Sequence, residues 1–327
     1  MSNYNVGDMI RLTRQAIGMS QEELCADICS VQTLSRIENG KVAVKRGTYR
    51  LLMEKMGRNG SKSYFSLQEN NFDMIDVIRK IDVLIWNREF EKAEEYLVQL
   101  KQVIREDEIL NMQYVNKVES IIDFESGRIS KEEHLANLEK AIFLTIPNYN
   151  DLLDKIYPFT MTEIHILMNI AEIYGKLDDK KQSILINYML IRSINSGYMS
   201  SKKITLILGY IIHSIARVYG EMGEHQTAIN MCQNAIKKAR SSHMFLILPT
   251  IYGEIARNMM EQIEKGQRDK NDIESCKRLL RQAYATAKLS NQYSMGKAIE
   301  ELYRDTFQED GIFSPSSEEK EVFFVSN

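Results

Sequence analysis

The chain has 327 residues, of which 44% are hydrophobic and 27% are charged, and its net charge is −3. This composition excludes a disordered chain and a small secreted scaffold held by disulfides, and the length favours two domains. Four cysteines without paired spacing indicate reduced thiols. The apolar runs are shorter than the roughly 18 to 20 residues that a membrane span requires, and the N-terminus has no apolar signal segment. The sequence therefore predicts a cytoplasmic protein with no membrane segment.

The charges are unevenly distributed along the chain. Residues 1–60 contain 9 Lys and Arg against 6 Asp and Glu, whereas the rest of the chain is net acidic. This distribution predicts that the basic N-terminal module contacts phosphates and that the larger, acidic module does not. The imbalance is small, so the motifs within this segment carry more of the argument.

A first helix is predicted near the N-terminus by a stripe of apolar residues at helical spacing. We place on its buried face Met9, Ile10, Leu12 and Ile17, and on its other face Arg11 and Arg14. Gly18 ends this helix.

Two further helices follow, each with a capping residue. Ser20 is an N-cap and Glu23, three residues later, completes a capping box, so a second helix begins here and extends to about Asp27. Ser30 caps a third helix over residues 31–38. We assign to the buried side of these two helices Leu24, Ile28, Leu34 and Ile37, and to the end of the third helix Asn39 and Gly40.

The stretch SQEELCADICSVQTLSRIENG, residues 20–40, resembles the XRE or Cro/repressor-type helix-turn-helix family, in which a SQEEL run is followed by an ending similar to SRIENG. In such a motif the second helix lies in the major groove of DNA. The turn, ADICSV, departs from the commoner pattern because it is one residue shorter and lacks a glycine. The alternative is a helical hairpin that only packs against the rest of the protein.

The resemblance implies a set of positions that contact double-stranded DNA. It places a phosphate contact at Gln21, base-facing positions at Val31, Gln32 and Arg36, a further DNA contact at Ser35, and phosphate contacts at Asn39, Lys41, Lys45 and Arg46. The Gln32 amide suits adenine, the Arg36 guanidinium suits guanine or a phosphate, and Val31 suits a thymine methyl group.

Residues 57–71, GRNGSKSYFSLQENN, are rich in Gly, Ser and Asn and predict a domain boundary, after which helical periodicity resumes. The predicted limits are a DNA-binding domain over 1–58, a linker over 59–71, a repeat domain over 72–308 and a C-terminal tail over 309–327. The tail contains an apolar VFFV segment at residues 322–325, which we expect to cover the last repeat. The alternatives are that it docks across a dimer interface or occupies a groove.

The second domain contains a repeat whose clearest copy reads AxxYGxxGxxxxAxxxxxxA, with Ala216, Tyr219, Gly223, Ala228 and Ala235. Small and aromatic residues at these offsets resemble the tetratricopeptide unit, in which two antiparallel helices approach closely. Looser copies contain Ala93, Leu97 and Leu100; Ile121, Phe124, Ala141 and Ile142; Ala171, Tyr174, Ser183 and Leu190; and Ala256, Met259, Cys276, Leu280 and Ala283. The predicted fold is all-α, with a small helix-turn-helix domain followed by a tetratricopeptide-like α-solenoid.

A solenoid of this kind has a concave groove lined by the first helix of each pair. The repeat register predicts that the groove presents Val118, Ile122, His165, Met168, Glu172, Tyr210, His213, Arg217 and Arg257. Such a surface suits an extended peptide, whose carboxylate Arg217 and Arg257 clamp through paired hydrogen bonds. The alternative is that these arginines pair with Glu172, Glu254 or Glu261 of neighbouring turns.

Catalytic and metal chemistry have no positive support in the sequence. Cys25 and Cys29 are four residues apart without a neighbouring histidine or second CxxC, so we expect burial rather than a metal or redox site. Cys232 and Cys276 fall at packing sites of the repeat. The five histidines form no ligand motif, and nucleotide-binding glycine loops and GxSxG are absent from the sequence. We therefore expect neither an enzyme nor a bound metal or cofactor.

A helix-turn-helix domain followed by degenerate tetratricopeptide repeats resembles the RNPP group of peptide-sensing regulators, with its PlcR-type and Rgg-type members. The short turn without glycine also resembles that group. The resemblance implies a homodimeric, cytoplasmic transcription regulator of the quorum-sensing type, which reads a palindromic operator and is controlled by a short signalling peptide bound to its repeats. The alternatives are a protein-interaction module whose repeats bind a partner signalling protein, and a repressor that needs no ligand.

Overall fold

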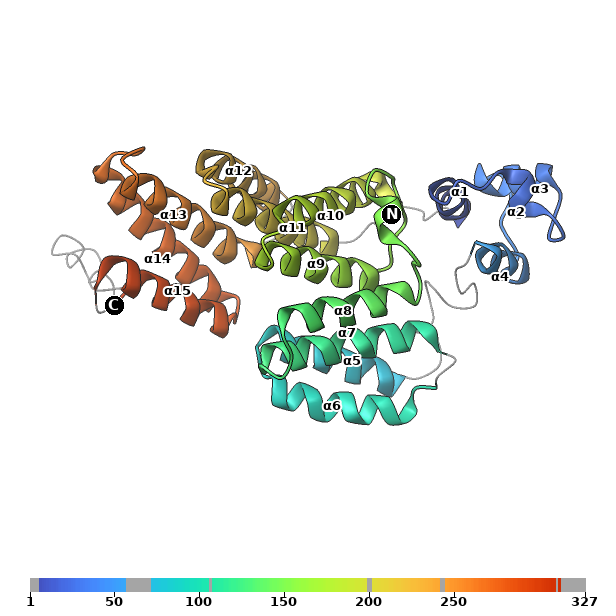
Figure 1. The fold of residues 1–327 in the computed structure, drawn as a ribbon, viewed down its shortest axis with the longest axis horizontal. Coiled ribbons are helices and arrows are strands. Elements are labelled where there is room, and N and C mark those ends of the chain that lie inside the picture. The colour runs from blue at the N-terminus through green and yellow to red at the C-terminus, as the bar shows by residue number, and fades with distance from the viewer. Residues whose placement is uncertain are drawn as a thin grey trace, which may run out of the picture. The chain divides into compact units, whose positions relative to one another are not determined.

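The structure is a computed structural model, which describes residues 6–56, 72–105, 108–198, 202–241, 245–309 and 311–312. Within these ranges every regular element is a helix or a helical turn, which confirms the all-α prediction (Figure 1). The chain divides into two compact units, residues 1–204 and 205–327. The predicted linker at 59–71 and the VFFV segment lie outside the described residues.

Four helices form the N-terminal module, namely α1 (Val6–Ala16), α2 (Gln21–Cys25), α3 (Val31–Glu38) and α4 (Arg46–Lys55). Both predicted caps are confirmed. Ser20 and Glu23 exchange the two hydrogen bonds of a capping box, and the Ser30 side chain accepts a hydrogen bond from the backbone N–H of Thr33. These caps fix where α2 and α3 begin, and therefore which of their side chains face outward.

Two features of this module differ from the sequence expectation. α2 ends at Cys25 and not at about Asp27, because Ala26 adopts an extended backbone and Asp27 a left-handed one with φ of 65°. α4 was not among the predicted helices, although Leu52 and Met53 on it are fully buried in the core shared with α1, α2 and α3.

The predicted buried stripe of α1 is right for Met9, Ile10 and Leu12 but wrong for two other side chains. Ile17 is 41% exposed, because α1 ends one residue earlier and the chain leaves the helical stripe. Arg14, expected on the outer face, is only 9% exposed. It is buried because it forms an ion pair with Glu38 inside the module.

The repeats of the first unit are three helical pairs. They comprise α5 (Phe72–Trp86) with α6 (Phe90–Val103), α7 (Ile109–Glu125) with α8 (Lys131–Phe143), and α9 (Met161–Lys176) with α10 (Lys180–Ser193). A 3-10 turn, η1 (Tyr149–Leu152), lies between α8 and α9, and a π-helical turn, η2 (Ile194–Tyr198), follows α10. The small residues predicted at close helix contacts, Ala93, Ala141, Ala171 and Ser183, are completely buried, which supports the repeat register at these positions.

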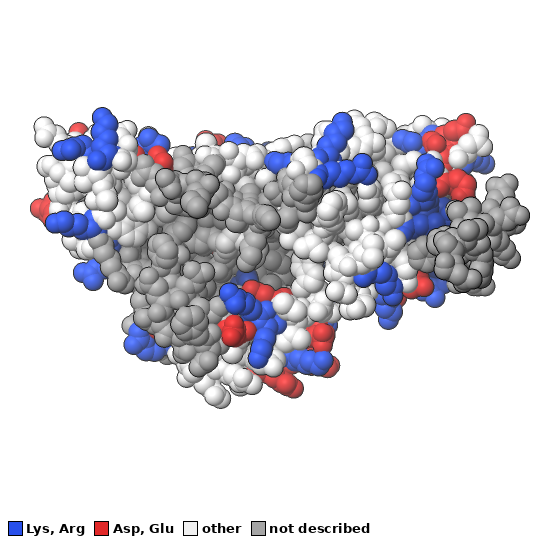
Figure 2. All heavy atoms as spheres, turned by 180° about the vertical axis from the view of Figure 1, so that it is seen from behind, with Lys and Arg blue, Asp and Glu red and all other residues white. Residues whose placement is uncertain are grey.

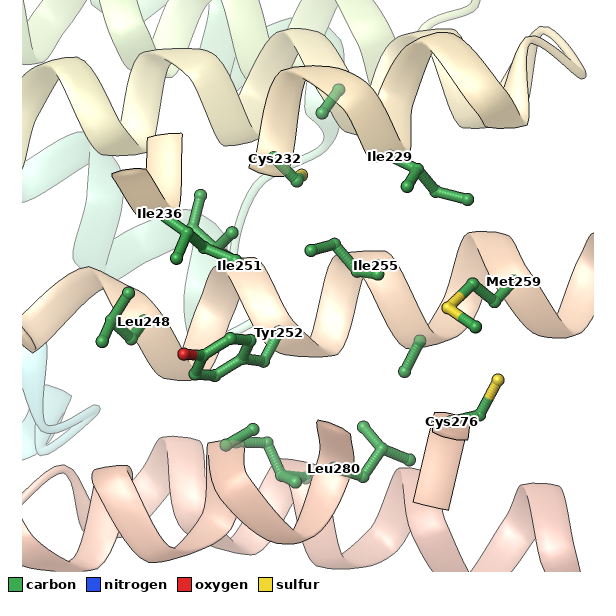
Figure 3. Close-up of a cluster of buried hydrophobic side chains, with 14 of the residues drawn as sticks. Ile229, Cys232, Ile236, Leu248, Ile251, Tyr252, Ile255, Met259, Cys276 and Leu280 are labelled. Carbon is green, nitrogen blue, oxygen red and sulfur yellow. The ribbon is translucent and has the colours of Figure 1, made fainter. Parts of the chain in front are cut away.

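The second unit contains most of α11 (Lys202–Glu221), and α12 (His225–Ser241), α13 (Leu248–Glu264), α14 (Ile273–Leu289) and α15 (Tyr293–Phe307), with short turns η3 (Phe245–Ile247) and η4 (Lys270–Asp272). Its core lies on both sides of α13. Figure 3 shows Cys232 directed from α12 toward α13, and Leu280 from α14 on the opposite side. Cys232 and Cys276 are fully buried, as predicted from their places in the repeat. No described helix is long and apolar enough to cross a membrane.

Candidate functional site

Five of the predicted DNA-contacting residues lie together on one surface of the N-terminal module. They line a shallow groove of about 440 Å³, formed by Gln21, Val31, Gln32, Ser35 and Arg36. Gln21 is the first residue of α2, and the other four lie on one face of α3 because they are spaced one, four and five residues apart. Gln32 and Arg36 are exposed, so their polar ends are accessible from solvent.

A buried ion pair holds this surface from beneath. Arg14 on α1 donates from Nε and Nη2 to the Glu38 carboxylate at 2.7 and 2.9 Å, and this hydrogen bonding raises the pKa of Arg14. Gln21 Nε2 donates to the same carboxylate at 2.6 Å. Glu38 therefore connects α1, α2 and α3 and fixes the orientation of the Gln21 amide.

This pair was not predicted from the sequence, although a signal for it is present there. Glu38 lies four residues after buried Leu34, so it shares the inward face of α3. A carboxylate at that position needs a buried cation, since an unpaired charge in a core is strongly unfavourable. Arg14 is the cation that satisfies it.

The other predicted phosphate contacts surround the end of α3. Asn39 is exposed at the C-cap, and its side-chain Nδ2 donates to the carbonyl of Ser35 at 2.7 Å. Lys41 and Lys45 are exposed, and Lys45 is the N-cap residue of α4. The side chain of Arg46 lies outside the described residues. Seen from behind, basic side chains outnumber acidic ones on the visible, coloured surface of this module (Figure 2).

The turn between α2 and α3 explains how the chain does without the glycine of the commoner pattern. Asp27 adopts the left-handed backbone conformation that favours glycine, a conformation that aspartate tolerates better than most side chains. Lys55 on α4 donates to the carbonyl of Ala26 at 2.7 Å and holds the turn against the module. The short turn thus keeps α3 in place at the cost of one strained residue.

The predicted ligand contacts on α7 must be corrected. Val118 and Ile122 are 0% and 1% exposed, and they pack in the core that α5, α6 and α7 share. Core neighbours enclose these two apolar side chains, so neither is accessible to a ligand. The sequence register was wrong here because a one-residue error rotates a helical position by about 100°.

His165, Met168 and Glu172 lie on one stripe of α9 and are partly exposed. Glu172 forms an ion pair with Lys176, one turn later on the same helix, with 2.9 Å between Glu172 Oε1 and Lys176 Nζ. The three residues remain accessible to a ligand within the first unit.

In the second unit, two predicted contacts converge on one buried carboxylate. Arg257 Nη2 donates to Glu254 Oε1 at 2.6 Å, and His213 Nε2 lies 3.5 Å from Glu254 Oε2. Asn258 Nδ2 also donates to Glu254 Oε1, at 2.7 Å. Burial raises the pKa of Glu254, but the hydrogen bonds and charges of His213 and Arg257 outweigh it and lower the pKa to about 2.

The pairing alternative is therefore observed for Arg257, which forms an ion pair with Glu254 of its own helix. Arg217, on α11, lies 3.9 Å from Glu221. Tyr210, one helical turn before His213, is mostly buried, and burial raises the pKa of its hydroxyl. Arg257 is still 38% exposed, so part of its guanidinium faces solvent.

The cysteines are structural in this fold. Cys25 is 4% exposed, and burial raises the pKa of Cys29, which the neighbouring Cys25 raises further. Burial raises the pKa of Cys232 to about 12 and that of Cys276 to about 11, so both thiols are protonated at neutral pH. Across the described ranges, no group of three or more His, Cys, Asp and Glu side chains is arranged to hold a metal ion.

Comparison with known proteins agrees with this architecture. Residues 10–61 match the helix-turn-helix family HTH_3. The structure of Bacillus thuringiensis PlcR in complex with the peptide PapR7 and DNA is similar over 90% of this chain and 99% of that chain, at 14% identity and a TM-score of 0.56. Apo PlcR from the same organism is similar at 12% identity over 90% of this chain and 98% of that chain, with a TM-score of 0.53.

A second solved relative has the same architecture. ComR from S. thermophilus, in complex with DNA and its signalling peptide ComS, covers 92% of this chain and 99% of its own, at 16% identity and a TM-score of 0.50. No curated protein matches the chain. At these identities the similarity establishes a shared fold, in which a helix-turn-helix domain precedes a helical repeat domain.

Proposed function

We propose that this chain, whose residues 10–61 form an XRE-type helix-turn-helix domain and whose fold is that of PlcR and ComR, is a transcription regulator controlled by a short signalling peptide. The observation that carries the proposal is the groove in which Gln21, Val31, Gln32, Ser35 and Arg36 meet. Four of these residues lie on α3, the helix that a helix-turn-helix protein inserts into the major groove, and Gln21 begins the preceding helix.

The chemistry of the groove suits direct reading of base edges. Arg36 can donate two hydrogen bonds to guanine, Gln32 can pair with adenine, and Val31 can contact a thymine methyl group. The amide of Gln21, held by Glu38, keeps a second N–H for a phosphate oxygen. Asn39, Lys41, Lys45 and Arg46 would contact the DNA backbone, which positions the module without specifying sequence.

A single reading helix contacts only a few base pairs, so we propose that the regulator acts as a homodimer on a palindromic operator in the cytoplasm. Two half-sites are separated by roughly 34 Å, and both reading helices must be in phase with them. A peptide that favours one arrangement of the dimer would then change the affinity for DNA. The domain limits proposed for this mechanism are 1–58, 59–71, 72–308 and 309–327.

The peptide would bind to the repeats through residues that remain partly accessible. In the first unit these are His165, Met168 and Glu172 on α9, and in the second unit they are Tyr210, His213, Arg217 and Arg257. Because Arg257 is already bound to Glu254, a peptide carboxylate would share its guanidinium rather than meet a free one. PlcR and ComR, as crystallised with PapR7 and ComS, are the precedent for a peptide in this fold.

The DNA-reading assignment is tested by fluorescence anisotropy with the DNA upstream of the protein's own coding sequence, at moderate salt. Gln32→Ala and Arg36→Ala should each weaken the specific complex by about 1–3 kcal/mol, which is roughly 5- to 150-fold. Arg50→Ala is the matched control, because it removes an exposed cation from α4 outside the groove. If both groove variants bind as tightly as the wild type, the assignment is wrong.

The peptide assignment needs a separate measurement. Synthetic peptides copied from short secreted reading frames beside the gene should change the anisotropy of the DNA complex, and Arg257→Ala should weaken that response. A specific DNA complex that no such peptide alters would identify a ligand-independent repressor. Binding of a partner signalling protein without any specific DNA complex would instead favour an interaction module.

A further inference from the structure

The repeat helix α7 contains a buried lysine that has no anionic partner in the part of the chain that the structure describes. Lys117 is only 4% exposed. Its Nζ lies 4.5 Å from the centroid of the Tyr114 ring, one turn earlier on the same helix. Among the described residues, no carboxylate oxygen lies within 4.0 Å of this Nζ, and none accepts a hydrogen bond from it.

Asp82, the acidic residue whose charge acts on Lys117, is engaged elsewhere. Tyr114 donates its hydroxyl hydrogen to Asp82 Oδ1 at 2.9 Å, and the same hydroxyl oxygen lies 3.3 Å from the carbonyl of Ile78, both on α5. Burial lowers the pKa of Lys117, and the Asp82 charge, acting from beyond ion-pair distance, opposes that effect. The ammonium group is therefore weakly stabilised by the fold itself.

Other lysines of these repeats have the opposite arrangement. They are partly or largely exposed and each has a carboxylate, as in Lys92 with Glu89, Lys101 with Glu119, Lys176 with Glu172, and Lys180 with Asp178. Arg14 in the N-terminal module is nearly as buried as Lys117, but two hydrogen bonds to Glu38 satisfy it. Lys117 thus combines the burial of an internal charge with the lack of an internal counter-ion.

An ammonium group on a side chain this buried is poorly hydrated, and contact with one aromatic ring offsets only part of the desolvation. The position of Lys117 on its helix suggests where a counter-ion would come from. Lys117, Ile121 and Phe124 share one stripe of α7, and the latter two are partly exposed. Val118 and Ile122, one residue further along, face the core.

We propose that Lys117 is a binding site for a carboxylate on the ligand of the repeat domain, with the Tyr114 ring packed behind its ammonium group. The ligand oxygen would accept the hydrogen bonds that the ammonium group lacks within the fold, and Asp82 would keep Tyr114 oriented. The inference rests on the proposed function only for the source of the carboxylate, which is a peptide terminus or acidic side chain, or else a free small acid.

The site is tested with the full-length chain and two probes that differ only in charge. N-acetyl-L-leucine carries a free carboxylate like that of a peptide C-terminus, and N-acetyl-L-leucinamide is its neutral counterpart. Ligand-observed NMR should detect binding of the acid and not of the amide. Lys117→Met should weaken binding of the acid at least ten-fold, whereas Lys101→Met, which removes an exposed lysine from α6, should leave it unchanged.

Thermal unfolding provides a second readout, because Lys117→Met replaces a charge that has no ion-pair partner by an apolar side chain of similar length. The melting temperature should stay the same or rise. A fall in the melting temperature would mean that the fold already satisfies Lys117, and the proposal would be wrong. Equal binding of the acid and the amide, or wild-type binding by Lys117→Met, would also overturn it.

Two further arms separate the possible outcomes. If acetate binds with the same affinity as N-acetyl-L-leucine, the ligand is a free small acid. If N-acetyl-L-leucine binds and acetate does not, the ligand is a peptide. Arg36→Ala should bind the acid like the wild type, because it alters only the DNA-reading groove. If the probe binds normally but no specific DNA complex forms, the proposed function is wrong and the Lys117 site stands. If a specific DNA complex forms but the probe does not bind, only the Lys117 site is wrong.

Discussion

The N-terminal module and the repeats differ in how well their predicted contact residues come together. In the module, Gln21 and four residues of α3 line one groove. In the repeats, Val118 and Ile122 are core residues, and Arg257 is bound to Glu254. The two regions have equally regular helices, so helix content does not explain the difference.

The difference lies in what fixes the rotation of each helix. In the module, Ser20 and Ser30 determine the first residue of α2 and α3, and a segment of only five residues, 26–30, joins the two helices. In the repeats, the rotation of a helix depends on contacts with neighbours 30 or more residues away, as between Tyr114 and Asp82. Local capping therefore predicts a site, whereas a repeat register predicts only the core.

The largest expected effect tests how much of the module's stability depends on the buried ion pair between Arg14 and Glu38. Glu38→Ala removes the acceptor of both Arg14 and Gln21 and leaves Arg14 buried without a partner. We expect the module to lose about 3–5 kcal/mol of unfolding free energy. Chemical denaturation should show a destabilised module, and a separate fluorescence anisotropy titration should show weaker DNA binding.

Glu22→Ala is the control for this variant, because Glu22 is exposed on α2 and adjacent to the groove residue Gln21. It should leave stability within about 0.5 kcal/mol of the wild type. If Glu38→Ala is equally mild, the ion pair does not hold the groove.

The second prediction concerns the corrected register of α7. Ile122→Ala should lower the unfolding free energy by about 2–5 kcal/mol, because the side chain is 1% exposed and its removal leaves a cavity. Ile121→Ala, on the partly exposed stripe beside Lys117, should cost much less. The midpoint of urea unfolding measures both. Normal stability with impaired ligand binding for Ile122→Ala would restore the original groove assignment.

The sequence predicted the existence and type of most helices because their signals are local. Apolar spacing, caps and small residues at repeat offsets identified α1 to α3 and the helical pairs. It failed where a tertiary partner decides the outcome. The sequence pattern placed Arg14 on the exposed face of its helix, whereas the ion pair with Glu38 buries it. The helix α4 was not predicted because no side-chain cap marks its start.

The third prediction uses pH to test the alternative that Arg257 pairs within the protein. Because the pKa of Glu254 is about 2 in the folded protein and 4.5 is its ordinary value, the ionised carboxylate stabilises the fold above pH 4.5. This contribution, up to about 3 kcal/mol, is lost as pH falls from 4.5 toward 2. Melting curves for the wild type and Glu254→Gln should therefore converge in this range.

Arg257→Ala should reduce the same pH dependence, since it removes one of the two side chains that lower the pKa of Glu254. Arg278→Ala on α14, an exposed cation outside this cluster, should not. An unchanged pH profile for Arg257→Ala would mean that the arginine is free for a ligand, and the contrast between the two regions would weaken.

The smallest effect concerns the turn that makes the module's motif unusual. Asp27 occupies a left-handed backbone position, where an L side chain costs roughly 1–2 kcal/mol and glycine does not. Glycine also loses more backbone freedom on folding, so Asp27→Gly should stabilise the module by about 0.5–1 kcal/mol. Asp27→Asn should be close to neutral, and Asp27→Val should destabilise, because a β-branched side chain fits this conformation worst. If Asp27→Gly stabilises the module and leaves DNA affinity unchanged, the turn only connects α2 and α3. If it stabilises the module but weakens binding, the strained aspartate sets the angle at which α3 meets DNA.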